Sequence, residues 1–314
     1  MKAPVKRGKP RLLIASGIVG VLVGSIYWCL PLSLAGFFIW PMTLWVLIGI
    51  ALCVVAKKTP VKARLGMIGF WLILWLTLDS QPRAWIPNID LSYGEITRVV
   101  SLNCAGGDPK AAAEAAAVKA DLILLQESPS TTELEELRTK LGPEWTAIHG
   151  PDGSILSRGP ARRIPLPPGT HNFVAAEWRE TLVISVRLQP PIFRLDYWSP
   201  DCWRAYAENR RVRMRELSEI VSWIEAVRGN RNLIIGGDFN SPPDRILMAE
   251  LGTQANDAFG DIGSGWGGTA INTMPLVRID QIWIGGSLFP CRAFVRPTRH
   301  SDHRMVIAEF YLQT

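Results

Sequence analysis

Two long apolar runs without a single charge stand near the start of this chain and restrict what its first part can fold into. Leu12 to Leu30 and Leu34 to Ala56 each reach the roughly 20 residues that a helix needs to cross the hydrocarbon core of a bilayer. A third run, Leu65 to Leu78, is shorter, and at about 1.5 Å per residue it falls short of a core of roughly 30 Å. The sequence therefore predicts a membrane region.

The placement of charges predicts the orientation of that region. Nine basic residues precede Leu65, whereas the first acidic residue is Asp79. They lie before the first run and between the second and third, so the positive-inside rule puts both segments in the cytoplasm. If the third run spans, everything after Asp79 is extracytoplasmic; if it lies in the interface, only two spans remain. We expect a multi-pass integral protein of the inner or plasma membrane with a basic cytoplasmic tail (1–11), a membrane region (12–79) of three transmembrane helices (12–30, 34–56 and 65–78) and an extracytoplasmic domain.

The net charge of +6 belongs to this N-terminal segment and not to the remainder of the chain. Of the 34 Lys and Arg residues, 25 remain when the nine are set aside, against 28 Asp and Glu, so the remainder carries about −3. Such a domain has no overall basic field for gripping a polyanion, which argues against a dedicated clamp for duplex DNA. Basic residues do gather locally, at Arg204, Arg210, Arg211, Arg213 and Arg215.

After a linker at 80–96, strand-like and helical patterns alternate and predict one α/β (α+β) domain over 97–314. The long stretch Arg204 to Val227 carries apolar residues at helical spacing, and its Arg-rich start is expected on the solvated face. The expected strands are 97–102, 122–125, 154–157, 173–177, 182–188, 232–236, 281–284 and 305–311, and the expected helices are 109–120, 131–141 and 204–227.

Three late segments place polar side chains at the ends of apolar strands. They are Leu233-Ile-Ile-Gly-Gly-Asp-Phe-Asn-Ser241, Arg278-Ile-Asp-Gln-Ile-Trp283 and Thr298-Arg-His-Ser-Asp-His303. Hard divalent cations prefer carboxylate and amide oxygens, and an attacking water needs a nearby base. The pattern is typical of a metal-dependent phosphoester hydrolase.

Earlier segments extend the pattern. Val99-Val-Ser-Leu-Asn103, Asp121-Leu-Ile-Leu-Leu-Gln-Glu127, Ser154-Ile-Leu-Ser-Arg158 and Gly267-Gly-Thr269 occur in the order in which similar motifs occur in the endonuclease/exonuclease/phosphatase superfamily, the pancreatic-deoxyribonuclease-like hydrolases. The resemblance covers roughly Thr97 to Tyr311. It implies a four-layer α/β/β/α sandwich of two mixed sheets, with the site at one edge.

The resemblance also implies roles for particular residues. Asn103, Glu127 and Asp302 are expected to bind the metal, Mg²⁺ or else Mn²⁺ or Ca²⁺. Asp238 is expected to orient or deprotonate the attacking water and Asn240 to donate to phosphoryl oxygens, with Gly236 and Gly237 leaving room for substrate or metal. His303 is expected to bind the phosphate, held by Asp280.

One position departs from the family pattern. The strand that usually supplies a second His aligns with Val186-Arg-Leu188, so Arg187 stands in its place. Arg cannot shuttle a proton near neutral pH but can bind phosphate through two parallel hydrogen bonds. Arg187 is therefore a candidate phosphate-binding residue.

Three functions remain open on the sequence alone. The first is a membrane-anchored phosphodiesterase or phosphatase acting on nucleic acid, a nucleotide, or a lipid or inositol phosphate. The second is a nuclease for DNA or RNA, favoured by Trp198, Trp203 and Tyr206 beside the arginines. The third is a catalytically weak binding module on the same fold, favoured only by Arg187. The expected partners are the phosphoester substrate and the lipid bilayer, and no protein partner can be predicted from the sequence.

Overall fold

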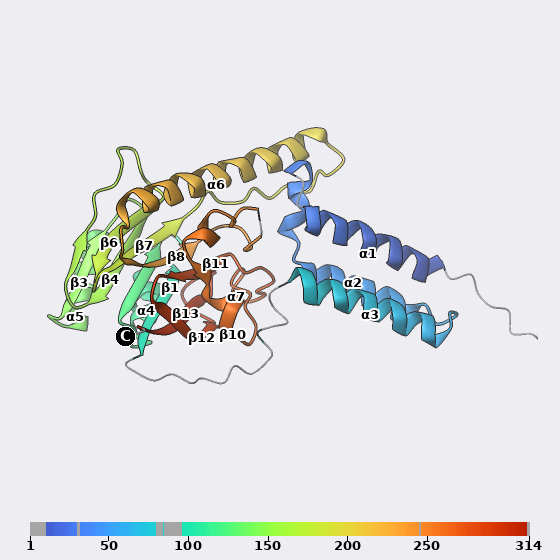
Figure 1. Ribbon diagram of the computed structural model, residues 1–314, viewed down its shortest axis with the longest axis horizontal. Coiled ribbons are helices and arrows are strands. Elements are labelled where there is room, and N and C mark those ends of the chain that lie inside the picture. The colour runs from blue at the N-terminus through green and yellow to red at the C-terminus, as the bar shows by residue number, and fades with distance from the viewer. Residues whose placement is uncertain (1–10, 30–31, 80–83, 85–95, 245, 313–314) are drawn as a thin grey trace, which may run out of the picture. The chain divides into compact units, whose positions relative to one another are not determined.

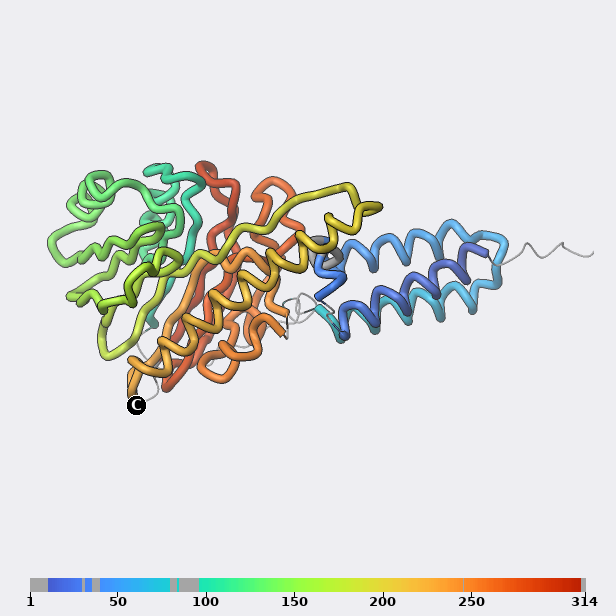
Figure 2. The backbone as a smooth tube through the Cα atoms, turned by 90° about the horizontal axis from the view of Figure 1, so that it is seen from above, coloured from blue at the N-terminus to red at the C-terminus, as the bar shows by residue number. Residues whose placement is uncertain are grey.

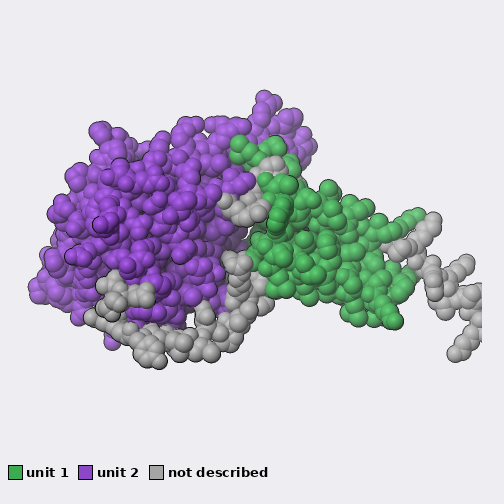
Figure 3. Space-filling model, viewed as in Figure 1, with its two compact units in different colours: residues 1–82 green, residues 83–314 purple. Residues whose placement is uncertain are grey.

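The computed structural model describes residues 11–29, 32–79, 84, 96–244 and 246–312. The predicted basic tail and linker fall almost entirely outside these residues. The chain divides into two compact units, residues 1–82 and 83–314 (Figure 3).

Unit 1 consists of apolar helices. They are α1 (Arg11–Cys29), the 3₁₀ segment η1 (Leu32–Ile39), α2 (Met42–Val55) and α3 (Val61–Leu78) (Figure 1). By length and composition, α1 and α3 can cross a membrane, and α2 is a shorter apolar helix. A tight interhelix contact joins α2 and α3, because a Cβ at Gly49 would lie 1.9 Å from the Trp71 ring. Trp71 Nε1 also donates to Ser16 Oγ of α1 at 2.9 Å.

Two helix bounds differ from the sequence prediction. The run expected as one helix over 34–56 is divided, because Pro41 adopts an extended conformation (φ −68°, ψ 148°) and α2 begins only after it. Proline lacks an N–H and disfavours helical geometry in the residue before it. The third helix, expected from Leu65, begins four residues earlier at Val61. Arg64 lies inside it and donates from Nε to the Cys53 carbonyl at the end of α2, at 2.8 Å.

The first sheet of unit 2 has seven strands among the described residues, in the order β10-β12-β13-β1-β2-β4-β3. β1 runs parallel to β2 and antiparallel to β13, so β1 lies in the sheet interior with its last five residues buried. The strands are β1 (Thr97–Asn103), β2 (Leu122–Gln126), β3 (Trp145–His149), β4 (Gly153–Arg158), β10 (Gly263–Ser264), β12 (Leu288–Arg296) and β13 (Met305–Leu312).

The second sheet has six strands among the described residues, in the order β5-β6-β7-β8-β11-β9. A close approach sets the parallel pairing of β7 and β8, because a Cβ at Gly237 would lie 1.8 Å from the Val186 carbonyl oxygen. The strands are β5 (Ala161–Arg163), β6 (Phe173–Trp178), β7 (Thr181–Arg187), β8 (Asn232–Asp238), β9 (Asn256–Asp257) and β11 (Asp280–Gly285).

Apolar faces stack these elements into layers. The two sheets meet through residues such as Leu124 of the first and Ile234 and Ile282 of the second. The outer face of the first sheet is covered by α4 (Pro109–Ala116) and α5 (Thr131–Leu141), and that of the second by α6 (Pro200–Val227). The expected four-layer sandwich of two mixed sheets is confirmed (Figures 1 and 2).

Short or interrupted strands escaped the sequence patterns. β12 carries Pro290 and two arginines, and its pairing with β13 shifts register between Pro290 and Arg292. β3, β5, β9 and β10, the short helix α7 (Ala258–Ile262) and the 3₁₀ turn η3 (Leu251–Thr253) were also not expected. α6 begins four residues before the expected Arg204, because Ser199 accepts a hydrogen bond from the Asp201 N–H as its N-cap and Pro200 takes the first turn.

Candidate active site

Asp280, which is buried, and His303, which is partly buried, form a pair at one edge of unit 2. Asp280 opens β11, and its carboxylate oxygens lie 2.9 and 3.1 Å from His303 Nδ1. Burial alone would lower the pKa of His303, but the charge and hydrogen bond of Asp280 outweigh it and raise the pKa to about 10. The imidazole is therefore protonated at neutral pH, donating from Nδ1 to Asp280 and keeping Nε2–H as a second donor.

Asp238 ends β8 directly opposite Asp280 in the antiparallel register. Its side chain is buried, and burial first, then the charge of Asp280, raise its pKa to about 7. Ligand atoms of Asp238, Asp280 and His303 all lie within 4.8 Å of one another. A carboxylate that titrates near neutral pH is suited to general-base chemistry.

Asn103 connects this trio with the first sheet. Its Nδ2 lies 3.1 Å from Glu127 Oε1 and 3.1 Å from Asp238 Oδ2, so one amide donates to two carboxylates. Its carbonyl oxygen accepts a hydrogen bond from Ser301 Oγ at 2.7 Å, and that hydroxyl accepts from the His303 N–H at 2.9 Å. Residues from both sheets thus meet at one edge.

Glu127 follows β2 with a backbone φ of 43°, a value that residues other than glycine rarely adopt. The chain therefore turns sharply as the strand ends. Its Oε2 accepts from the Gly106 N–H at 2.6 Å, and its Oε1 lies 2.7 Å from Arg187 Nη2. Burial would raise its pKa, yet the hydrogen bond from Asn103 and the charge of Arg187 hold the pKa below its ordinary value. Glu127 is therefore an ionised carboxylate at neutral pH.

Arg187 ends β7 beside Asp238 in the parallel register. Its guanidinium bridges two carboxylates, with Nη2 on Glu127 and Nη1 3.0 Å from Asp152 Oδ2. The residue predicted to bind phosphate is thus in contact with the predicted metal ligand. Its role as a phosphate-binding residue stays a prediction.

Asn240 is held by contacts with Leu188 and Asp238. Asn240 has a φ of 50°, and its Nδ2 donates to the Leu188 carbonyl at 2.8 Å while its N–H donates to Asp238 Oδ1 at 2.9 Å. It therefore orients Asp238, and its role as a phosphate donor stays a prediction. Both glycines allow close packing within the fold: a Cβ at Gly236 would lie 2.8 Å from the Leu124 side chain of the facing sheet, and one at Gly237 would lie 1.8 Å from the Val186 carbonyl oxygen. That they leave room for substrate or metal stays a prediction.

Asp302 is exposed, and its carbonyl accepts from the Asn272 N–H at 2.6 Å. Among the described residues, neither Glu127 nor Asp302 belongs to the group of three that could hold a metal. The oxygens of Asn103, Glu127 and Asp302 are nevertheless the donors that a hard divalent cation prefers, so their chemistry fits Mg²⁺. Arg187 is a competing cation on Glu127.

Three supporting residues were not assigned roles from the sequence. Thr269 Oγ1 accepts from the Ile279 and Asp280 N–H groups, each at 3.1 Å, and fixes the start of β11. Ser301 ties Asn103 to His303, and Asp152 holds Arg187. Thr269 and Ser301 lie within motifs that the sequence showed, whereas the turn containing Asp152 gives no local signal for its partner 35 residues away.

The Arg-rich start of α6 is only partly the solvated face that its sequence predicted, because Arg204, Arg211 and Arg215 are exposed and two other arginines are not. Arg210 and Arg213 are buried, with Arg210 paired to Asp244 at 2.9 Å and Arg213 donating to Asn209 at 2.5 Å. They are buried because they continue the helix face that carries Tyr206 and Leu217. Arg204 and Arg211 are exposed and pair with acidic residues of the same helix.

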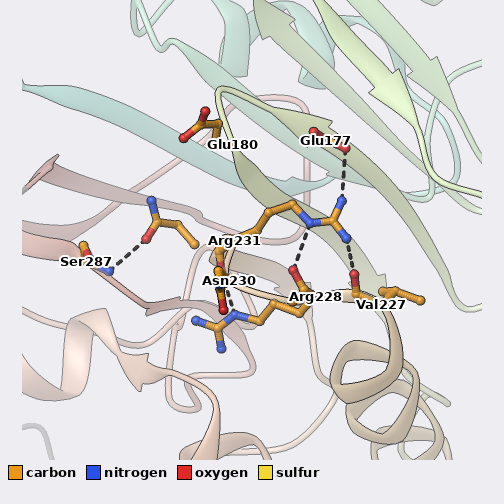
Figure 4. Close-up of a pocket in the computed structure, with 9 residues that line it drawn as sticks. Glu177, Glu180, Val227, Arg228, Asn230, Arg231 and Ser287 are labelled. Atoms are coloured by element: carbon orange, nitrogen blue, oxygen red, sulfur yellow. Dashed lines mark hydrogen bonds and ion pairs between the residues drawn. The ribbon is translucent and has the colours of Figure 1, made fainter.

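A separate hollow lies at the opposite edge of the second sheet, where β8 begins (Figure 4). Its lining includes Glu177, Arg228 and Arg231. Arg231 pairs with Glu177 at 3.0 Å, and Arg228 donates to the Gln254 carbonyl at 2.9 Å. None of the predicted site residues lines it, so the candidate active site is at the other edge.

Solved structures share this fold. Humanized D. rerio TDP2 carrying 14 mutations superposes with a TM-score of 0.51 at 15% identity, covering 69% of this chain and 99% of that one. The endonuclease/exonuclease/phosphatase from Bacteroides vulgatus gives a TM-score of 0.51 at 13% identity, covering 70% and 100%. The family protein from Bacteroides thetaiotaomicron gives 0.51 at 14%, covering 71% and 100%.

No curated protein sequence matches the chain. The model of the endonuclease/exonuclease/phosphatase family, however, matches residues 100–303, which is well over half of the chain and contains every predicted site residue. The chain therefore belongs to the endonuclease/exonuclease/phosphatase family, and its fold agrees with that of the solved structures.

Proposed function

We propose that this protein is a membrane-anchored phosphoester hydrolase that depends on a divalent metal ion. The observation that carries the proposal is the convergence of Asp238, Asp280 and His303 within 4.8 Å, next to an ionised Glu127. A carboxylate base, a protonated imidazole and an oxygen-rich metal side are the groups that phosphoester hydrolysis requires.

Each residue has a role in this proposal. Asp238, with a pKa of about 7, accepts a proton from the attacking water. His303 donates from Nε2 to a phosphoryl oxygen, and Asp280 keeps the ring charged and oriented. Asn103 and Asn240 hold the Asp238 carboxylate in place. A divalent ion held by Glu127 and Asp302 would supply positive charge for the oxygens of the phosphate.

The nuclease alternative receives less support from the contacts. D. rerio TDP2 is known with a single-strand DNA product. In this chain, however, four of the five clustered arginines are buried or paired within α6. Strong nucleic-acid binding draws on cations available to phosphates.

Metal removal tests the function directly. The full chain in detergent micelles should hydrolyse bis(p-nitrophenyl) phosphate with Mg²⁺ or Mn²⁺, and EDTA should abolish the turnover. Glu127→Ala should weaken metal dependence, while Glu136→Ala, at an exposed position on α5, should not. Equal turnover in EDTA would refute the metal assignment.

Reporter fusions test the proposed topology. With three spans and an inside N-terminus, alkaline phosphatase fused after Thr314 should be active and a fluorescent cytoplasmic reporter there should be dark. α3 decides the outcome, since its 18 residues span about 27 Å at about 1.5 Å per residue. A bright cytoplasmic reporter would move the active site to the cytosol.

A further inference from the structure

An arm projects from the edge of unit 2 that carries the candidate active site. The 28 residues of α6 extend about 42 Å, whereas the seven of β8 cover about 23 Å. The part of α6 from Met214 to Val227 packs on the second sheet. The preceding part therefore extends past the strand ends (Figures 1 and 2). We call residues 189–213 the α6 arm.

The loop that leads into α6 is held along the arm. It starts at Leu188, whose N–H donates to the Asp238 carbonyl at 2.9 Å, so it leaves the sheet beside the active site. Successive loop residues then bond to earlier and earlier helix residues, and the loop therefore runs outward, antiparallel to α6. These bonds join Gln189 to Arg213 (3.3 Å), Arg194 to Tyr206 (2.7 Å) and Tyr197 to Trp203 (2.8 Å).

The loop of this arm exposes three large apolar side chains. Phe193, Leu195 and Trp198 are 66%, 58% and 85% exposed although the loop around them is well ordered by hydrogen bonds. Exposed apolar side chains on a well-ordered segment indicate a surface that contacts another partner.

A second loop at the same edge repeats this property. Ala270 pairs with His303 in a β-bridge, and Asn272 Nδ2 donates to the Ser301 carbonyl at 3.0 Å. Beside them, Ile271 and Met274 are 60% and 59% exposed. We call the five side chains Phe193, Leu195, Trp198, Ile271 and Met274 the apolar rim.

On the arm, the charged side chains next to the rim are paired, which favours a bilayer over a polyanion as its partner. Arg194 pairs with Asp196, and Arg204 pairs with Asp201 at 3.0 Å, so these groups add no net charge. Trp and Phe favour the boundary between lipid headgroups and acyl chains. The same chain carries α1 and α3, which are long and apolar enough to hold it in a membrane.

We propose that the apolar rim docks the active-site edge on the surface of the lipid bilayer in which the chain is anchored. The substrate would then be a lipid phosphoester, reached at that surface. The inference rests on the membrane anchoring in the proposed function, and it goes further by stating which edge of unit 2 meets the lipid.

Quenching by brominated lipid tests this contact in the full chain. The protein is placed in nanodiscs of ordinary or brominated phosphatidylcholine, and tryptophan fluorescence is compared between variants. The fluorescence of Trp198 is obtained as the difference between the wild type and Trp198→Phe. The fluorescence of a tryptophan in the second loop is obtained as the difference between Met274→Trp and the wild type. Phe289→Trp is the matched control, because Phe289 is 40% exposed but pairs with Tyr311, at the end of β13 away from His303.

Brominated lipid should quench the contributions at 198 and 274 roughly twofold or more and leave that at 289 unchanged. Two outcomes overturn the proposal: no quenching at 198 and 274, or equal quenching at all three positions. If the rim is not quenched and cysteines placed in it cross-link two copies of the chain, the rim is an interface between chains and the proposal is overturned. Failure of the anchoring itself is distinguishable, because the chain would then not co-purify with nanodiscs.

Discussion

The two sides of the candidate active site are built on different physical principles. On one side, the buried Asp238 and Asp280 face each other through the register of β8 and β11, and Asp280 holds the protonated ring of His303. On the other, Glu127 and Asp152 are partly exposed and share Arg187, through a long side chain. The comparison teaches that strand pairing alone aligns the two buried aspartates, whereas the exposed side also depends on a long side chain that bridges two carboxylates.

The largest expected effect is on the buried side. Asp238→Asn and His303→Ala should each lower the rate of aryl phosphodiester hydrolysis by roughly 10² to 10⁴, because a positioned base or a charged donor is removed. Steady-state kinetics with circular dichroism as a check on folding would measure this. Wild-type rates in a folded Asp238→Asn protein would place the chemistry elsewhere and remove the distinction between the two sides.

A smaller loss is expected for Asp280→Asn, roughly tenfold, since Asp280 acts through the ring. Its clearest sign is a shift in titration. The pKa of His303, about 10, lies above its ordinary value near 6.5. The pair therefore stabilises the fold fully below pH about 6.5, and this stabilisation is lost as the pH rises through about 10. NMR of ¹³C-labelled histidine should show the pKa falling in Asp280→Asn, with His303→Ala assigning the signal; an unchanged pKa would contradict the pairing.

The exposed side should respond mainly in metal affinity. Arg187→Met removes a cation 2.7 Å from Glu127, so Mn²⁺ binding measured calorimetrically should tighten by about tenfold or less, given that the site is partly exposed. Arg162→Met is the control, because Arg162 pairs with Glu177 on β5 and β6. Weaker Mn²⁺ binding in Arg187→Met would show that the guanidinium does not compete with the metal.

The sequence predicted the parts of this molecule that rest on local pattern. Asp238 and Asp280 come at the ends of apolar strands, and such strands deliver their end residues to a sheet edge. Asp152 could not be predicted as the partner of Arg187, because their contact depends on how the β3–β4 turn lies over the second sheet. The burial of Arg213 was missed because charge suggested a solvated position, although helical spacing places it in line with Leu217. β12 was missed because Pro290 and its arginines obscure the alternation of a strand.

The contact between Arg187 and Glu127 also bears on how the protein reaches its working state. A partly buried carboxylate without a counter-charge is costly, and many metal sites therefore fold together with their metal. Here the chain supplies its own cation to Glu127. The carboxylate consequently has a counter-charge without any metal ion. An ion bound at Glu127, as proposed above, would exchange one positive charge for another.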